Sequence, residues 1–263
     1  MKSPRILFPL LTLLTLALLA ADVMTGAVSL TPAEVWDALT GRADAATVAI
    51  VRHIRLLKAL TALMAGVALS VSGLQMQTLF RNPLSGPYVL GISSGASLGV
   101  ALVILGAPVF GAATSMGVAL AAWLGAAAIL GLITAISTRI RDIMVVLILG
   151  IMLSSAIGAV VQVLQYLSRE EALKSFVVWT MGSLGDVTAV QFPVLLGGIA
   201  AGLLLAVATV KPLNMLLLGE TYARSLGLDL TRSRLFIMLS TTMLAGSVAA
   251  FCGPIGFVGL AMP

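Results

Sequence analysis

The chain has 263 residues, of which 60% are hydrophobic and 10% are charged. Soluble domains carry about 25% charged residues, so this composition excludes a water-soluble globule, and the apolar content also excludes a disordered chain. The net charge of +5, from 15 basic and 10 acidic residues, is attributed to membrane topology, since Lys and Arg gather in cytoplasmic loops. The chain is therefore predicted to be an integral membrane protein in contact with lipid, with no nucleic-acid partner.

Seven apolar windows lack Asp, Glu, Lys and Arg and approach the length of about 20 residues that a membrane-spanning helix needs. They are Ile6–Ala21, Ala59–Leu79, Tyr88–Phe110, Met116–Ile136, Ile143–Leu167, Phe192–Val210 and Leu235–Phe251, and an eighth begins at Ile255. The predicted fold is an all-α polytopic transmembrane bundle forming one domain over residues 1–263. The first window is alternatively a signal peptide, because Lys2 and Arg5 precede it, but the six further spans favour a retained helix.

The distribution of basic residues gives an orientation. With the N-terminus inside, the outer loops hold six of the 15 basic residues, namely Arg42, Arg52, Arg55, Lys58, Arg169 and Lys174, and the inner loops hold the other nine. Since basic residues mark cytoplasmic loops, residues 211–234 are predicted to form a cytoplasmic loop and Arg52 and Arg55 to lie outside.

Small residues recur at four-residue spacing in three windows. The sets are Gly91, Gly95 and Gly99; Gly117, Ala121 and Gly125; and Gly150, Ser154 and Gly158. Membrane helices associate through close backbone approach, which small residues permit, so these faces are predicted to be packing seams. The last stripe continues to Gln162 and Tyr166, whose amide and phenol groups need partners or water where they are buried.

Several functional classes find no support in the sequence. There is no G-x-x-x-x-G-K-[ST] phosphate loop, His53 is the single histidine and Cys252 the single cysteine, and the seven windows contain no carboxylate. We expect no enzymatic activity, no metal site and no bound cofactor. Movement of a solute against its gradient would need energy supplied by a partner. Two functional classes remain open at this point: an ion-coupled secondary transporter or channel, and a membrane enzyme.

Three segments stand out from the apolar background. Residues 81–96 read RNPLSGPYVLGISSGA, with prolines that break the helix between two spans. Residues 218–228 read LGETYARSLGL and predict a short amphipathic helix in which Glu220 pairs with Arg224 and Gly227 ends the helix. Residues 252–260 read CGPIGFVGL and predict an irregular turn with close backbone contacts. A tight turn and a solvated loop helix are the simpler interpretations of the first two.

These segments together resemble the FecCD-type ABC importer permeases, which take up iron–siderophore complexes, haem or cobalamin. The resemblance rests on RNPLSGPYVLGISSGASLG, LGETYARSLGL and CGPIGFVGLAMP in that order. Arg52-His53-Ile54-Arg55 and Trp179-Thr180-Met181-Gly182-Ser183-Leu184 match two further family signatures. Five signatures in order make the resemblance specific from about Val51 to Pro263.

The resemblance implies a ten-helix inner-membrane permease that pairs with a second copy of itself. It also implies two cytoplasmic ATPase subunits, which hydrolyse the ATP, and an extracytoplasmic substrate-binding protein. The implied site residues are Gly219, Glu220, Ala223, Arg224 and Gly227 for coupling to the ATPase, Arg52 and Arg55 for docking of the binding protein, and Asn82, Pro83 and Leu84 for a cytoplasmic gate. The fifth span resembles the helix that lines the family's central channel, and we expect Gln162 and Tyr166 to line the wall of that pathway. Since family members continue beyond the third signature, the chain is expected to be truncated at Pro263.

Overall fold

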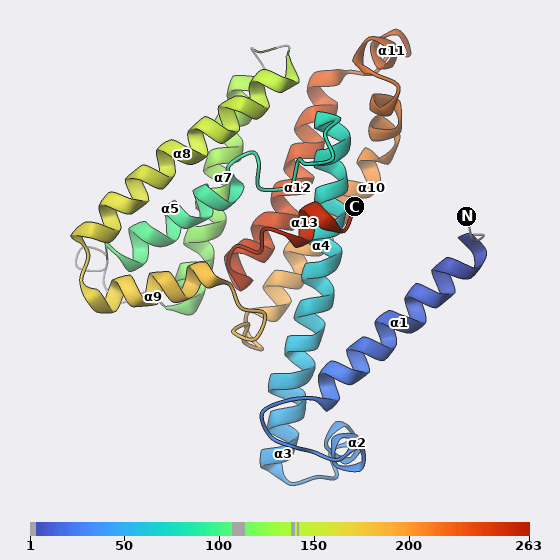
Figure 1. Cartoon of the computed structure of the whole chain (residues 1–263), viewed down its shortest axis with the longest axis vertical. Coiled ribbons are helices and arrows are strands. Elements are labelled where there is room, and N and C mark those ends of the chain that lie inside the picture. Colours follow the sequence, from blue (N-terminus) through green and yellow to red (C-terminus); the bar gives the residue numbers. More distant parts are fainter. Residues whose placement is uncertain (1–3, 107–113, 138–139, 141) are drawn as a thin grey trace. The chain divides into compact units, whose positions relative to one another are not determined.

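The computed structural model describes residues 4–106, 114–137, 140 and 142–263, and this part of the chain folds into helices joined by turns (Figure 1). Six of the described helices are long and apolar enough to cross a membrane. They are α1 (Pro4–Met24), α4 (Leu56–Phe80), α7 (Ser115–Ser137), α8 (Ile143–Leu167), α10 (Phe192–Leu217) and α12 (Leu230–Cys252). The predicted all-helical polytopic fold is confirmed.

The other helices are shorter. They are α2 (Pro32–Thr40), α3 (Ala45–Ala49), a π-helical turn (Ile50–Arg55), α5 (Ile92–Ile104), α9 (Glu170–Met181), α11 (Glu220–Ser225) and α13 (Val258–Ala261). The helices α3 and α4 and the π-turn between them form one continuous helical segment, Ala45–Phe80.

The chain divides into two compact units. The first comprises residues 1–64 and 184–192, and its apolar core includes Val23, Val35 and Val51. Helix α2 begins with a capping box, in which Thr31 and Glu34 bond each other's backbone N–H groups. The hydrogen bonds from the backbone and side chain of Thr31 lower the pKa of the Glu34 carboxyl group.

The second unit comprises residues 65–183 and 193–263, and α5 and α7 pack tightly within it. A Cβ atom on Gly95 would lie 2.5 Å from the Gly125 carbonyl oxygen, and one on Gly99 would lie 2.0 Å from the Ala121 carbonyl oxygen. No side chain fits at such distances, so the two backbones touch through their glycines. The packing seam predicted for these two helices is confirmed at Gly95, Gly99, Ala121 and Gly125, whereas a Cβ atom on Gly117 would meet only the Thr114 hydroxyl within 4 Å.

Helix α12 is the most enclosed membrane-spanning helix of the described part of the chain, because 72% of its apolar window is buried. It packs against α7 and α5 within the second unit (Figure 1). Its fully buried side chains include Ile237 and Leu244. Helix α12 is therefore the buried central helix of this unit.

Several windows differ in their bounds from the helices that the structure forms, and the window from Ile255 holds only the short α13, Val258–Ala261. The window Tyr88–Phe110 was predicted as a full span, but helix α5 covers only Ile92–Ile104, and residues 107–110 lie outside the described part. Gly91 has the left-handed φ of +80° and is the N-cap of α5, so the helix begins only at Ile92. The window Phe192–Val210 extends to Leu217, because α10 continues through the exposed Lys211 and the half-buried Pro212. Residues 211–234, which we expected to form a loop, are therefore mostly helical.

Candidate functional site

The segment 218–228 folds as the predicted short helix, α11. Gly219 precedes it at φ +102°, a conformation that favours glycine. At its end Gly227 has φ +83°, its N–H donates to the Arg224 carbonyl (2.9 Å), and the Leu228 N–H donates to the Ala223 carbonyl (3.0 Å). This pair of hydrogen bonds is a Schellman motif. The prediction that Gly227 ends the helix is confirmed.

The predicted ion pair within α11 is wrong. The Glu220 carboxylate accepts a hydrogen bond from the guanidinium of Arg234, at 2.5 Å, instead of pairing with Arg224. Arg234 is buried in the second turn of α12, and its charge needs a buried partner more than an exposed arginine does. The pair therefore ties α11 to α12 and leaves the Arg224 side chain exposed.

The two sides of α11 differ in exposure. Ala223 is fully buried, whereas Tyr222, Arg224 and Leu226 are exposed. An aromatic ring, an aliphatic side chain and an arginine together have the composition of a protein–protein contact. The helix therefore has one side fixed on the bundle and one side exposed.

A cavity of about 680 Å³ lies beside α11. Its walls come from the end of α4 at Leu79–Arg81, the start of α8 at Asp142–Met144, and α11 at Glu220, Thr221 and Arg224. Helix α11 and the ends of two membrane-spanning helices therefore border the same space.

The turn predicted as a gate follows α4 directly. Arg81 leaves the helix at φ +49°, and the Asn82 side-chain oxygen then accepts a hydrogen bond from the Leu84 N–H (2.9 Å). The Asn82 carbonyl accepts a second one from the Ser85 N–H (3.1 Å). This compact turn presents Pro83 and Leu84 outward, and Leu84 is 75% exposed.

The two arginines of the Arg52–Arg55 segment are placed differently. The Arg52 side chain is exposed and donates one hydrogen bond to the Leu39 carbonyl (2.6 Å). Arg55 is 5% exposed, and its guanidinium donates to the carbonyl oxygens of Val23, Met24 and Val28. The expectation that both arginines present their charge to a partner is therefore corrected for Arg55. Its hydrogen-bonding groups fix the turn after α1.

Helix α8 carries the two predicted pathway residues on an open face. Gln162 is exposed, and Tyr166 is 89% exposed. The packing predicted at Gly150 is confirmed, since a Cβ atom there would lie 2.9 Å from the Val89 carbonyl oxygen. The same prediction for Gly158 is wrong, because a Cβ atom there would meet nothing within 4 Å among the described residues.

Segments far apart in the sequence meet through glycines. Gly253, at φ +74°, leaves only 2.6 Å between an added Cβ atom and the Trp179 carbonyl oxygen, and the Ser183 N–H donates to the Cys252 carbonyl at 2.7 Å. A Cβ atom on Gly259 would lie 2.6 Å from the Pro87 ring. The predicted close contacts of the turn after α12 are confirmed.

A buried polar cluster was missed by the sequence analysis. The Gln75 amide nitrogen donates to the hydroxyls of Thr209 (3.1 Å) and Ser240 (3.0 Å), and the Thr241 hydroxyl donates to the Gln75 side-chain oxygen (3.1 Å). The cluster joins α4, α10 and α12. Polar side chains in membrane helices hydrogen-bond across helices, but no spacing in the sequence pairs residues this far apart.

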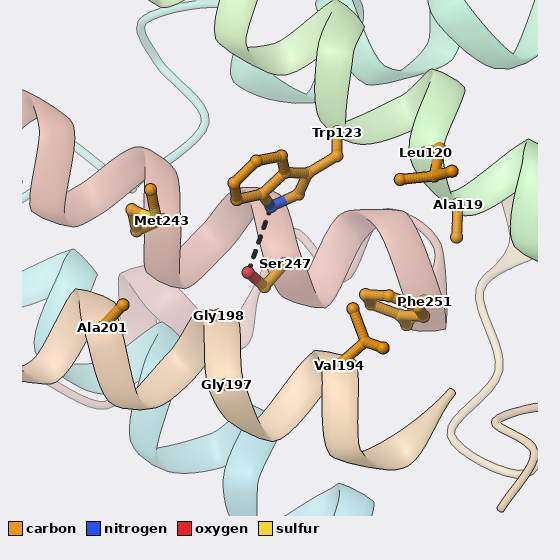
Figure 2. Close-up of a pocket in the computed structure, with 10 residues that line it drawn as sticks. All are labelled: Ala119, Leu120, Trp123, Val194, Gly197, Gly198, Ala201, Met243, Ser247 and Phe251. Carbon is orange, nitrogen blue, oxygen red and sulfur yellow. Dashed lines mark hydrogen bonds between the residues drawn. The ribbon is translucent and has the colours of Figure 1, made fainter. Parts of the chain in front are cut away.

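An apolar cavity of about 320 Å³ lies between α7, α10 and α12 (Figure 2). Leu120, Val194 and Phe251 are among its lining residues. Its two polar side chains satisfy each other, because the Trp123 indole N–H donates to the Ser247 hydroxyl at 3.2 Å (Figure 2). The cavity therefore offers apolar contact and no free polar side chain.

Within residues 4–106, 114–137, 140 and 142–263, no group of three or more His, Cys, Asp or Glu side chains lies close enough together to hold a metal ion.

Comparisons with known proteins identify the family. The model of the FecCD transport family matches residues 13–263. The chain is 36% identical over 266 residues to the hemin transport system permease protein HmuU of Yersinia pestis, covering 99% of this chain and 78% of that protein. It is 35% identical over 252 residues to the vitamin B12 import system permease protein BtuC of Salmonella typhi, covering 95% of this chain and 76% of that protein.

A solved structure shows the same fold. An inward-facing conformation of a metal-chelate type ABC transporter matches with a TM-score of 0.85 and 29% identity, over 98% of this chain and 79% of that one. The family, the fold and the apolar helices agree on a multi-pass protein of the inner membrane. The chain belongs to the FecCD transport family, and it is a permease subunit of an ABC importer.

Proposed function

We propose that this permease moves a ferric siderophore, haem or cobalamin inward, with no catalysis of its own. A homodimer of permeases would work with two cytoplasmic ATPase subunits and an extracytoplasmic substrate-binding protein. The names of the relatives support haem or vitamin B12 as cargo, and the solved neighbour supports a metal chelate.

The observation that carries the proposal is the two-sided helix α11. Its exposed side chains, Tyr222, Arg224 and Leu226, form the surface that the ATPase grips. Its inner side is fastened to α12 by the Glu220–Arg234 pair. Gly219, Ala223 and Gly227 shape and seat the helix. When ATP binding closes the ATPases, the movement of α11 reaches α12 through this pair.

The remaining roles follow the same path through the membrane. The binding protein docks on Arg52, while Arg55 positions the outer turn beneath it. Asn82, Pro83 and Leu84 narrow the cytoplasmic end of the pathway. Gln162 and Tyr166 line its wall, on the face of α8 that the described residues leave open to the second copy.

The experiment that tests coupling is the substitution Arg224→Glu in the permease co-expressed with its ATPase. Reversing one exposed charge at a contact is expected to weaken co-purification of the ATPase about tenfold, which corresponds to about 1.4 kcal/mol. ATP-dependent uptake into vesicles should fall with it. The matched control is Arg169→Glu, an exposed arginine before α9 that changes the net charge equally.

Arg169→Glu should still co-purify with the ATPase and should keep ATP-dependent uptake. Full co-purification together with stimulated ATP hydrolysis in Arg224→Glu would remove α11 from the coupling contact.

A further inference from the structure

A second cavity, of about 310 Å³, lies between α5, α8 and α9. It nearly equals the apolar cavity of Figure 2 in volume but differs in chemistry. Its polar lining side chains are Ser93, Ser94, Ser97, Gln162, Gln165 and Thr180. Its apolar wall includes Val161 and Phe176.

The serines of this cavity are not satisfied by the protein. Elsewhere in the bundle a serine hydroxyl bonds a carbonyl of its own helix, as Ser70, Ser154 and Ser233 do. Within the described part of the chain, the side chains of the three cavity serines make no hydrogen bond, and neither do those of Gln162 and Gln165. The three serines and Gln165 are only partly exposed. Polar groups inside a membrane protein need a partner, so water or a ligand must supply one to these side chains.

The packing of α5 and α8 explains why these groups face an open space. Gly95 and Gly99 hold α5 against α7, which leaves the serines on the side toward α8. On α8, Gln162 and Gln165 are three residues apart and share a face. Gly158 borders the same cavity and places no side chain in it. The space between the helices is therefore kept open and polar.

The lining carries no charged side chain. Recognition here must come from hydrogen bonds together with apolar contact. Hydroxyl and amide groups donate to carboxylate and carboxamide oxygens alike, while Val161 and Phe176 can pack against an apolar ring. A chelate with acyl groups at the edge of an apolar ring has this composition.

We propose that the cavity between α5, α8 and α9 is a binding site for the acyl oxygens, carboxylate or carboxamide, at the edge of the cargo chelate. The site holds the chelate in transit and rests on the proposed transport function. Gln162, which the pathway already includes, shares this task with Ser93, Ser94 and Ser97 on the neighbouring helix.

The test uses a reporter thiol in the purified full chain. In a Cys252→Ser background, Ser94→Cys places the sole thiol in the cavity, and its reaction with methyl methanethiosulfonate is timed with and without ligand. The probes are metal-free protoporphyrin IX, which has a carboxylate edge, and cyanocobalamin, which has a carboxamide edge. At a concentration about five times Kd, a bound probe should slow the reaction about sixfold.

The control is Ser155→Cys, an exposed position on α8 whose hydroxyl already bonds the Ile151 carbonyl. Its reaction should be unchanged by either probe. Protection of Ser94→Cys by one probe or both supports the site and tells which edge it accepts. No protection by either probe, or equal protection at Ser155→Cys, overturns it.

Ser97→Cys repeats the measurement should Ser94→Cys disturb folding. The outcome is separable from the proposed function, because ATPase co-purification through α11 does not involve this cavity. Retained ATPase association without protection at either serine would refute the binding site and leave the coupling role intact.

Discussion

Helices α12 and α8 are similar in length and both apolar, but the protein uses them in opposite ways. In α12, 72% of the apolar window is buried, against 17% in α8. The Ser240 hydroxyl on α12 bonds the Gly202 carbonyl on α10, whereas Ser154 and Ser155 on α8 bond carbonyls of their own helix. Hydropathy detects both as membrane spans. The partners of their polar atoms distinguish a buried central helix from a helix with a free face.

The largest expected difference between the two helices concerns matched isoleucines. Ile237→Ala on α12 removes a fully buried side chain and should lower the free energy of unfolding by about 2–4 kcal/mol. Ile148→Ala on α8 removes a 55% exposed one and should change it by about 0.5 kcal/mol or less. Denaturant unfolding of the purified chain in detergent measures both. Equal losses would mean that the two helices are not differently packed.

A smaller difference is expected between two glutamines. Gln75→Leu removes the side-chain amide that hydrogen-bonds three hydroxyl groups on α10 and α12. The loss should lower the free energy of unfolding by about 1–2 kcal/mol. Gln162→Leu on the open face of α8 leaves no hydrogen bond broken within the described residues and should leave stability unchanged. It should impair uptake instead. Reversed results, with a destabilised Gln162→Leu, would contradict this division between fixed and free helices.

The smallest expected effect on stability is at the connection between α12 and α11. Glu220→Gln replaces the carboxylate bound to Arg234 by an amide that keeps one acceptor oxygen, so we expect a loss of about 1 kcal/mol. The control Glu171→Gln, at an exposed position of α9, should fall within about 0.5 kcal/mol of the unchanged protein. Thermal unfolding compares the two. The account of the Glu220–Arg234 pair fails if both variants unfold alike.

Local patterns predicted the features that depend on neighbours in sequence. The glycines of α5 and α7, the stop at Gly227 and the close turn at Gly253 all follow from backbone requirements that a short segment displays. The same local reasoning misplaced the end of α10, because the helix tolerates Lys211 and Pro212 at the end of its span.

Features that depend on distant partners could not be predicted in this way. Glu220 lies one helical turn from Arg224, yet it pairs with Arg234, whose burial is set by tertiary packing. Arg52 and Arg55 belong to one sequence motif, but only Arg55 is buried. Its guanidinium donates to carbonyl oxygens more than 25 residues away. Gln75 bonds residues 134 and 165 positions away. Residue type marks such groups as polar and does not name their partners.

The most direct measurement of the central claim asks what touches the exposed side of α11. In a Cys252→Ser background, Tyr222→Cys is labelled with benzophenone maleimide and irradiated in membranes that contain the ATPase and the binding protein. Val178→Cys, an exposed position on α9, is the matched control. We predict a cross-link from Tyr222→Cys to the ATPase and none from Val178→Cys. A cross-link from Tyr222→Cys to the binding protein, or to lipid alone, would contradict the account.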